Sequence, residues 1–350
     1  MSVRTLPARE ALAQLDTFSA VIDARSESEY ALDQIPGAVN WPVLNDEERR
    51  VIGTLYRQVS PFEAKKRGAA LVARNVAAHI ERELLDTPKN WQPLVYCWRG
   101  GNRSGAMATI LGAIGFRVTL IEGGYKAYRQ ALLEDLPPQV AQLKFRVVCG
   151  RTGTGKTHLL QVLARAGAQV LDLEALAEHR SSVLGLIPGR PQPSQKHFDS
   201  RLWQALRAMD PASEVYVEAE SKRVGNVALP ESLVEAMRTS PCLTLQMPLA
   251  ERVQLLLRDY AFFTRDIDFF CERLATLVTL RGREMVARWQ AQARAGDLAG
   301  VVQALLDEHY DPKYEQSMAR NFAHYTAAPR HELPDGSPAT FERLAVTLHG

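Results

Sequence analysis

Short apolar runs alternate with amphipathic stretches over the first third of the chain. Four of these runs have the length of strands and are bounded by polar turns: Ala20–Asp23, Ala38–Pro42, Leu94–Cys97 and Val118–Ile121. Runs of this kind, separated by segments with helical spacing, predict buried strands joined by crossover helices. The pattern therefore predicts an α/β domain.

The sequence EDLPPQV follows a helical stretch that covers Tyr125–Leu133. Proline lacks an N–H and clashes with the preceding helical turn, so Pro137 and Pro138 predict the end of that helix and a domain boundary. We therefore expect a first domain over residues 1–136 and a second domain over residues 140–350.

A second alternation of strands and helices begins after the two prolines. Its predicted strands are Leu143–Cys149, Ala168–Leu173, Val215–Glu218 and Cys242–Gln246. From Leu249 to His309 charged residues stand among apolar ones at helical spacing, which favours helices. The second domain is therefore predicted to be a parallel α/β domain with a helical C-terminal region.

Composition narrows the class of protein. A chain of 350 residues with 46% hydrophobic residues has enough apolar material for two cores, and a net charge of +2 neither requires nor excludes nucleic acid as a partner. No secretion signal is evident at the start, and no apolar run approaches the roughly 20 residues that cross a bilayer. We therefore expect a soluble cytoplasmic protein with no membrane partner.

The four cysteines lack the close spacing of a zinc site or a disulfide framework: Cys97, Cys149, Cys242 and Cys271. Cys97 stands where a predicted strand gives way to a helix that begins near Ser104. Its loop contains two glycines, which let backbone N–H groups surround an anion, and two cations: Arg99, Gly100, Gly101 and Arg103. These surroundings favour a thiolate nucleophile. The alternative is a small buried core cysteine.

A phosphate-binding motif, GRTGTGKT, follows the strand that leads to Cys149. It has the G-x-x-x-x-G-K-S/T pattern between a strand and a helix, as P-loops require, and it comprises Gly150, Arg151, Thr152, Gly153, Thr154, Gly155, Lys156 and Thr157. The glycines allow the backbone to wrap phosphate oxygens, Lys156 supplies a charge, and Thr157 offers a hydroxyl to a magnesium ion. The loop indicates a diphosphate or triphosphate ligand, whatever group is attached to it.

Polar residues follow two strands of the second domain. Glu218, Glu220 and Arg223 come at the end of one strand, where they either serve a phosphate-bound metal or a nucleophile, or are merely solvated. A second group either lines the same cleft or caps helices: Asp172, Glu174, His179, Arg180, Gln195 and Lys196.

Several motifs carry a resemblance to known families. VIDARSESEYALDQIPGAVNWPV, CWRGGNRS and IEGGYKAYR resemble the rhodanese family over residues 1–135, with an Asp23–Arg25 pair and a turn at Pro36 and Gly37 as scaffold. Followed by GRTGTGKT, LDLEALAEHR, QPSQKHFDSRL and EAESKRVGN, they resemble the bacterial tRNA 2-selenouridine synthase family across essentially the whole chain. Ser181 stands where that family is expected to have glycine.

The resemblance implies a two-step reaction on 2-thiouridine at the wobble position of tRNA. Geranyl diphosphate first alkylates the sulfur, and selenium from selenophosphate then replaces the geranylthio group. It implies that Cys97 carries the selenium, that tRNA is a partner, and that a selenophosphate-supplying enzyme is a candidate partner. Magnesium is a candidate ion, and no tightly bound cofactor is expected.

Three hypotheses connect these chemistries to the second domain. The phosphate loop binds the diphosphate of the geranyl donor. An apolar groove for its chain is lined by Phe262, Phe263, Phe269 and Phe270, unless these form ordinary core. The tRNA backbone follows basic helical residues, unless these form a solvated face: Arg252, Arg258, Arg281, Arg283 and Arg288.

Two other functions remain open on the sequence. One is a persulfide sulfurtransferase coupled to a P-loop domain that binds ATP or GTP. The other is a nucleotide-switched binding module in which Cys97 has no chemical role.

Overall fold

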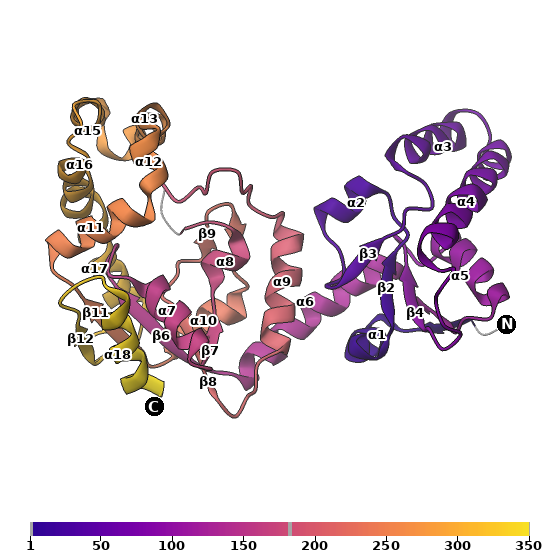
Figure 1. The fold of residues 1–350 in the computed structure, drawn as a ribbon, viewed down its shortest axis with the longest axis horizontal. Helices are drawn as coiled ribbons and strands as arrows, with labels where there is room; N and C mark the ends of the chain where they lie inside the picture. Colours follow the sequence, from indigo (N-terminus) through magenta and orange to yellow (C-terminus); the bar gives the residue numbers. More distant parts are fainter. Residues whose placement is uncertain (1–2, 181–183, 350) are drawn as a thin grey trace. The chain divides into compact units, whose positions relative to one another are not determined.

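The computed structural model describes residues 3–180 and 184–349 (Figure 1). Contacts within the chain divide it into two units. Unit 1 contains Met1–Asp135 and Asp199–Gln204, and unit 2 contains Leu136–Phe198 and Ala205–Gly350. Each unit has its own parallel five-stranded sheet. The predicted α/β class is therefore confirmed.

The sheet of unit 1 has the strand order β1-β5-β4-β2-β3. The strands are β1 (Val3–Leu6), β2 (Ala20–Asp23), β3 (Ala38–Asn40), β4 (Pro93–Tyr96) and β5 (Val118–Ile121). All except β1 coincide within a residue or two with predicted runs. Ile22 and Val95 on the inner strands are fully buried, so this core holds β4 and the loop that follows it.

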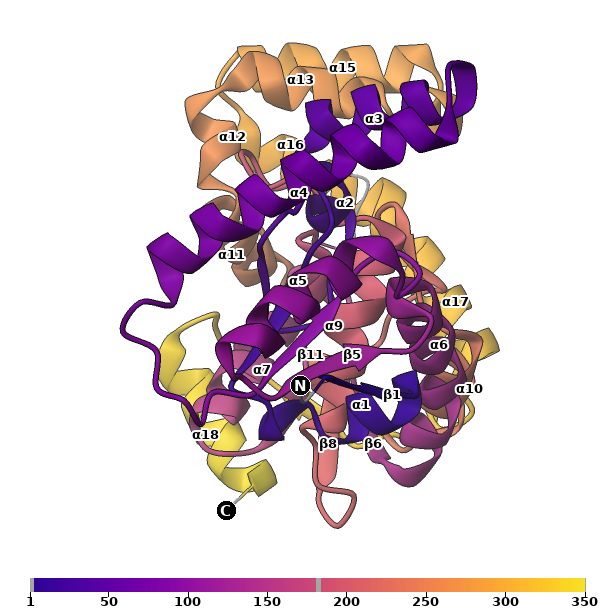
Figure 2. The ribbon, with the colours of Figure 1, turned by 90° about the vertical axis from the view of Figure 1, so that its right-hand side faces the viewer.

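Helices cover the sheet of unit 1: α1 (Ala8–Ala13), α2 (Glu27–Leu32), α3 (Asp46–Gln58), α4 (Pro61–Glu83), α5 (Asn102–Ile114) and α6 (Gly124–Gln142), with a short 3-10 turn η1 at Leu15–Thr17. Helices α3 and α4 lie side by side as a hairpin, which Figure 2 shows clearly. Asn45 caps α3 by accepting from the Glu48 amide, and Ser60 caps α4, whose first residue is Pro61. The turn between them is short, because α3 ends at Gln58 and α4 begins at Pro61.

The prediction that Pro137 and Pro138 end a helix is wrong. Both prolines lie inside α6, which continues to Gln142. Proline in a helix interior typically costs about 3 kcal/mol. Burial offsets that cost here, because Leu132, Leu136 and Val140 are at most 2% exposed on successive turns of α6.

The sheet of unit 2 has the strand order β12-β11-β6-β8-β7. The strands are β6 (Lys144–Gly150), β7 (Gln169–Leu171), β8 (Glu214–Glu218), β11 (Cys242–Gln246) and β12 (Arg330–Glu332), and a separate antiparallel pair consists of β9 (Arg223–Val224) and β10 (Val227–Ala228). The central strand β6 and its neighbour β8 both end at the edge from which the phosphate loop emerges. Parallel strands place ligand sites at this edge.

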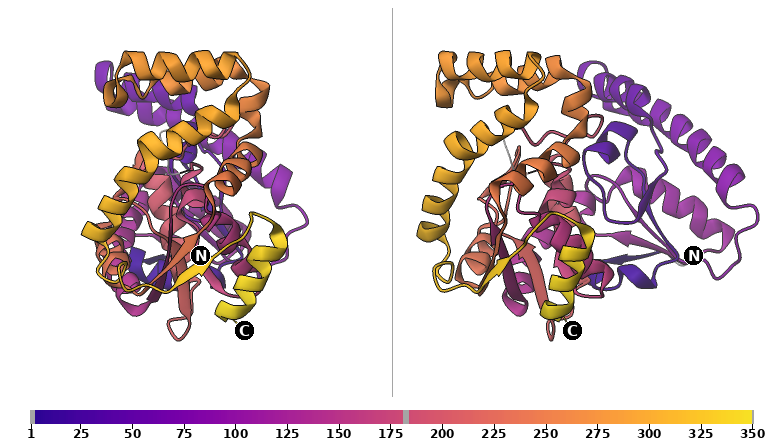
Figure 3. Two further views of the ribbon diagram at one scale, coloured as in Figure 1. Left: turned by 90° about the vertical axis from the view of Figure 1, so that its left-hand side faces the viewer. Right: turned by 60° about the vertical axis from the view of Figure 1, so that its left-hand side comes forward.

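The remaining helices belong to unit 2, except for Asp199–Gln204 of α9. They are α7 (Lys156–Arg165), α8 (Leu173–Ala177), α9 (Gln195–Arg207), α10 (Glu231–Thr239), α11 (Leu249–Asp259), α12 (Ala261–Arg265), α13 (Ile267–Ala275), α14 (Val278–Arg281), α15 (Arg283–Arg294), α16 (Leu298–Leu305), a π-helical turn η2 (Leu306–Tyr310), α17 (Asp311–Asn321) and α18 (Pro338–His349). Helices α12 to α16, orange in Figure 3, gather beyond one end of the sheet around the buried Trp289 and Leu274. The predicted helical region is confirmed, although β12 interrupts it to add an edge strand. None of the helices in the described part of the chain has the length and hydropathy needed to cross a membrane.

Candidate functional site

Cys97 is the first residue after β4, and it begins the loop that leads into α5. Gly100 has a φ of +65°, and a Cβ atom there would lie 2.6 Å from the Ile121 carbonyl oxygen. Gly101 has an ordinary φ of −110° and open space around it. Only Gly100 therefore requires glycine to turn the loop back over the sheet.

The Cys97 thiol is buried, yet its surroundings favour the thiolate. Ser104 Oγ donates a hydrogen bond to Cys97 Sγ over 3.2 Å. Burial opposes ionisation, but the Ser104 hydroxyl, the amides of Ser104 and Gly101 and the charge of Arg103 together outweigh it, so the pKa of Cys97 is lowered. A buried thiolate with hydrogen-bond donors on one side is equipped for nucleophilic attack on a chalcogen.

A carboxylate from another helix holds Arg103 in place. Glu29 on α2 accepts two hydrogen bonds from the Arg103 guanidinium, at 2.6 and 3.2 Å, and Arg49 lies 3.1 Å from the same carboxylate. Burial alone would raise the pKa of Glu29. The hydrogen bond from Arg103 and the charges of Arg103 and Arg49 outweigh burial, so the pKa of Glu29 is lowered. Glu29 is therefore ionised and fixes Arg103 near Cys97, whereas Arg99 is exposed.

The first turn of α6 braces the cysteine loop. The Tyr125 amide donates to the Cys97 carbonyl at 2.8 Å, and the Lys126 amide donates to the Trp98 carbonyl at 3.1 Å. Gly124 has a φ of +57°, and a Cβ there would lie 2.3 Å from the Cys97 carbonyl oxygen. The GGYK motif therefore shapes the site through close backbone contact.

The expected ion pair behind the loop is present. Arg25 donates to Asp23 within the core, with Nη2 and Oδ2 2.6 Å apart, and Tyr96 donates to the same carboxylate at 2.8 Å. Arg25 also lies over the Tyr125 ring at 3.9 Å. This network ties β2, β4 and the start of α6 together.

The phosphate loop spans the gap between β6 and α7 in unit 2. Gly153 and Gly155 have φ values of +83° and +79°, and Gly155 is the N-cap residue of α7. Lys156 Nζ donates to the Gly150 carbonyl at 3.0 Å. The first turn of α7 has backbone N–H groups without helical partners, so the loop has the donors and the cation that bind phosphate oxygens.

Three carboxylates meet the end of the phosphate loop. Oxygen atoms of Glu174, Glu218 and Glu220 lie within 4.8 Å of one another. Thr157 Oγ1 donates to Glu218 at 2.7 Å and lies 3.3 Å from a Glu174 oxygen. Burial and the charge of Glu174 raise the pKa of Glu218 to about 8, although Lys156 and Thr157 oppose the shift. A hydroxyl and carboxylates converging in a buried site match the oxygen ligands that Mg²⁺ prefers.

Helix α17 and the buried Arg252 support the phosphate loop from outside. Tyr314 Oη accepts from the Gly150 amide at 2.6 Å, and Arg151 pairs with Glu315 at 2.8 Å. Arg252 is 3% exposed, binds Asp311 through both terminal nitrogens and donates to the Thr152 carbonyl at 2.8 Å. The hypothesis that Arg252 follows a tRNA backbone is therefore wrong, because its charge is committed to the loop.

Most of the other arginines of that hypothesis also have partners within unit 2. Arg258 donates to the Gly336 carbonyl, Arg281 to His309, and Arg288 to Glu308. Arg283 is exposed. The alternative, a solvated helical face, describes Arg288, which is exposed and forms an ion pair with Glu308.

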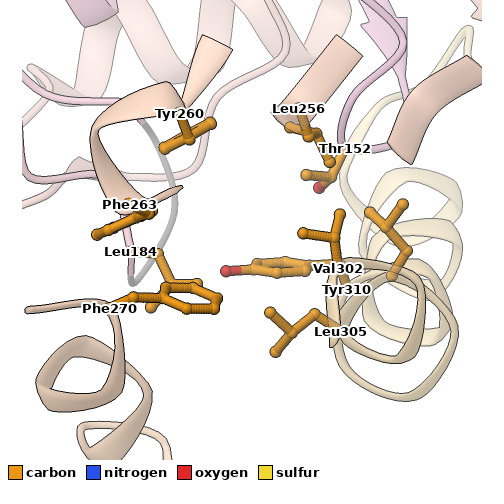
Figure 4. A pocket seen from close by; sticks show the side chains of 10 residues that line it. Thr152, Leu184, Leu256, Tyr260, Phe263, Phe270, Val302, Leu305 and Tyr310 are labelled. Atoms are coloured by element: carbon orange, nitrogen blue, oxygen red, sulfur yellow. The ribbon is translucent and has the colours of Figure 1, made fainter. Parts of the chain in front are cut away.

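An apolar pocket begins at the phosphate loop. It encloses about 60 Å³ and is lined by Thr152, Leu184, Leu256, Tyr260, Phe263, Phe270, Val302, Leu305, Leu306 and Tyr310. Figure 4 shows Phe263 and Phe270 facing Val302 and Leu305 across it. Of the four phenylalanines predicted to line a groove, Phe263 and Phe270 line this pocket, while Phe262 and Phe269 pack against the neighbouring helical core. Phe263 and Phe270 are also buried members of that core, so the predicted alternative, ordinary core, holds for all four.

Comparison with known proteins places these two units in one family. A family model described as the AAA domain of tRNA 2-selenouridine synthase matches residues 143–273, and a rhodanese-like domain model matches residues 7–131. A tRNA 2-selenouridine synthase of Marinobacter nauticus is 33% identical over 329 residues, which cover 86% of this chain and 88% of the relative. The chain belongs to the tRNA 2-selenouridine synthase family. Relatives of the same name from Nitrosomonas europaea and Alcanivorax borkumensis are 36% and 34% identical over 81% and 86% of this chain, and over 75% and 90% of their own lengths.

Within this member of the synthase family, the other predicted site residues lie as follows. Arg223 is exposed and donates to the Asn226 carbonyl of its own β9–β10 turn. Asp172 caps α8 by accepting from the Ala175 amide, which was the alternative weighed for it. Arg180 donates to the Asp259 carbonyl, and Ser181 lies outside the described residues.

Two residues of the candidate site, Glu29 and Ser104, were not singled out as site residues from the sequence, and a third, Glu174, was left between two roles. Glu29 acts on Cys97 by holding Arg103 in place, and Ser104 acts on it by donating a hydrogen bond to the thiol. Glu174 was grouped with cleft or capping residues, although it joins Glu218 at Thr157. A signal existed for two of them: Ser104 is in CWRGGNRS, and Glu174 stands one turn after a strand end, where a carboxylate reaches a P-loop metal.

Proposed function

We propose that this protein is a tRNA 2-selenouridine synthase that first geranylates 2-thiouridine at the wobble position and then replaces the geranylthio group with selenium. The names of its relatives support the overall activity. The observation that carries the two-step form is the continuity of the phosphate loop with an apolar pocket, because Thr152 belongs to both. A prenyl diphosphate is a ligand with these two parts.

In the first step, the sulfur of 2-thiouridine attacks C1 of geranyl diphosphate. The new S–C bond forms as the C–O bond breaks, and the diphosphate leaves with the electron pair. The amides at the start of α7 and the Lys156 ammonium stabilise the charge that grows on the diphosphate. Phe263, Phe270 and the aliphatic side chains opposite them hold the hydrocarbon chain away from water.

Thr157 and the three carboxylates, Glu174, Glu218 and Glu220, would hold a magnesium ion at the diphosphate. A divalent cation supplies charge neutralisation for a leaving phosphate group. Burial and, after it, the charge of Glu174 raise the pKa of Glu218, and a cation held between the carboxylates would offset both effects. This donor set therefore fits the ion that the chemistry needs.

In the second step, Cys97 exchanges the geranylthio group for selenium. Its thiolate attacks C2 of the modified base, an S–C bond forms, and geranylthiolate leaves with the electrons of the old C–S bond. The selenium of selenophosphate then attacks the same carbon, and the Cys97 thiolate leaves with the electrons of its bond to C2. Water attacks the phosphorus, and the Se–P bond breaks with its electrons staying on selenium, which leaves selenium on the base and releases phosphate. Ser104, Arg103 and the loop amides stabilise the anions held there.

Nucleoside mass spectrometry of tRNA incubated with the purified protein, geranyl diphosphate and selenophosphate tests the proposal. Wild-type protein is expected to give geranylated and then selenated thiouridine. Cys97→Ala is expected to stop selenation and to leave geranylation intact, since Cys97 has no part in the first step. Absence of both products together with rapid ATP or GTP hydrolysis would instead favour a sulfurtransferase coupled to a nucleotide-binding domain.

A further inference from the structure

The α3–α4 hairpin of unit 1 ends in an exposed apolar tip. Tyr56 is 52% exposed, and Val59 and Phe62 are both 70% exposed. A group of large apolar side chains with this exposure is typical of a binding surface. They are close in sequence because α3 ends at Gln58 and α4 begins at Pro61.

The same tip is basic. Residues 56–67 contain four basic side chains, Arg57, Lys65, Lys66 and Arg67, and one acidic side chain, Glu63. All four basic residues are exposed. The opposite end of α3 carries the acidic Asp46, Glu47 and Glu48. Positive charge is thus concentrated where the apolar side chains are exposed.

Phe62 and the lysines form one surface. Phe62, Lys65 and Lys66 are spaced three and four residues apart on α4, so they share a face of the helix. Lys66 Nζ lies 5.6 Å from the centre of the Phe62 ring and pairs with Glu63 at 2.7 Å. Because such an exposed pair contributes little, Lys66 can exchange Glu63 for another anion.

The chemistry of this tip favours nucleic acid over protein as its occupant. Lysine is depleted at the centres of protein interfaces, whereas lysine and arginine bind phosphates, and exposed aromatic rings stack on unpaired bases. An exposed aromatic ring with Lys66 beside it and further basic residues nearby in the same segment matches an unpaired nucleotide and its neighbouring phosphates.

We infer that the tip of the α3–α4 hairpin, residues 56–67, docks the tRNA substrate by stacking an unpaired base on Phe62 and binding nearby phosphates through Lys65, Lys66 and Arg67. This inference rests on the proposed function, since it takes tRNA as the substrate. It assigns the hairpin a binding role separate from the chemistry at Cys97 and at the phosphate loop.

Fluorescence anisotropy with labelled tRNA tests the inference on the full-length protein. Phe62→Ala is expected to raise the Kd by about tenfold, as loss of one base–aromatic stack does. It is expected to leave the Kd for a blunt RNA duplex without unpaired bases unchanged. Replacing Lys65, Lys66 and Arg67 together with Gln is expected to reduce the slope of log Kd against log salt by about 2.

Leu85→Ala and Lys89→Gln are matched controls, because both residues are exposed just beyond the other end of α4. They are expected to bind tRNA as the wild type does. At saturating tRNA, Phe62→Ala is expected to form product at the wild-type rate, so only KM changes. Thermal melts check that each variant is folded.

The outcomes separate the inference from the proposed function. If the wild type modifies tRNA and Phe62→Ala and the triple variant bind tRNA with wild-type Kd and salt slope, the docking inference is wrong and the function stands. The same holds if the variants keep tRNA binding but lose a complex with a selenophosphate-supplying enzyme, which would make the tip a protein interface. If the wild type modifies no tRNA, the proposed function fails first.

Discussion

Ser104→Ala is expected to weaken the thiolate of Cys97. The Ser104 hydroxyl donates to Cys97 Sγ over 3.2 Å in a buried site, and it is the largest of the influences that lower the pKa of this thiol against the opposing effect of burial. A hydrogen bond to a charged acceptor contributes about 1.5–3 kcal/mol. The lower end of that range corresponds to about a tenfold smaller thiolate population at a pH below the pKa.

The assay is the rate at which iodoacetamide alkylates Cys97, followed by mass spectrometry of the peptide that contains it. At pH 7 the variant is expected to react about ten times more slowly than the wild type. The pH midpoint of the reaction is expected to move upward, because the folded protein stabilises the charged form less. Since removal of a hydroxyl also changes access, rates are compared with the plateau reached at high pH.

Thr109→Val is the control for this substitution. Thr109 lies on the same helix, α5, but its hydroxyl donates to the Gly105 carbonyl and is exposed. Its pH profile is expected to match that of the wild type. A Ser104→Ala protein with wild-type midpoint and wild-type rate at pH 7 would refute the view that this hydroxyl activates Cys97.

Three further predictions concern unit 2. Val302→Trp fills the pocket beside the phosphate loop and is expected to raise the KM for geranyl diphosphate while inorganic diphosphate still binds. An equal loss of affinity for both ligands would contradict the view that the pocket holds the geranyl chain. Glu218→Gln is expected to weaken Mg²⁺ binding by at least about tenfold in calorimetry, whereas Glu214→Gln, at the half-buried start of the same strand, is expected to leave it unchanged; equal affinities would exclude Glu218 as a ligand. Gly155→Ala places a Cβ 2.2 Å from Phe341 Cζ at a φ of +79°, and it is expected to lower the free energy of unfolding of unit 2 by more than about 2 kcal/mol in urea. Gly167→Ala has a similar φ but open space around it, so an equal loss of stability in this control would show that backbone strain alone is responsible.

The inner strands that the sequence revealed consist mostly of buried residues, and the predicted edge strands β3 and β7 each have one buried residue. Val21, Leu94 and Val147 lie in the inner strands and are at most 8% exposed. The edge strand β1 has no buried residue, and β12 has the polar sequence RHE. Strands of this kind form because a neighbour offers backbone hydrogen bonds, so no hydrophobic pattern announces them.

The double proline shows where local rules fail for a physical reason. Pro137 and Pro138 each remove a helical hydrogen bond, and the local rule predicts a break. Leu132, Leu136 and Val140 are buried along the same helix, and burying three large apolar side chains contributes a free energy comparable to the cost of the two prolines. Tertiary burial therefore determines that α6 continues through both prolines, and a single sequence does not show which side chains are buried.

The same limit applies to charge at the two candidate sites. The positions of Cys97, Lys156 and Thr157 followed from motifs, because loop and helix are adjacent in sequence. Glu29 is 74 residues from Arg103 and Arg252 is 59 residues from Asp311. Which arginine meets phosphate and which supports a loop depends on these distant partners. An arginine on a helix is thus informative about ligand binding only once its carboxylate neighbours are known, and this is why the exposed basic residues of the α3–α4 tip are the stronger candidates for tRNA.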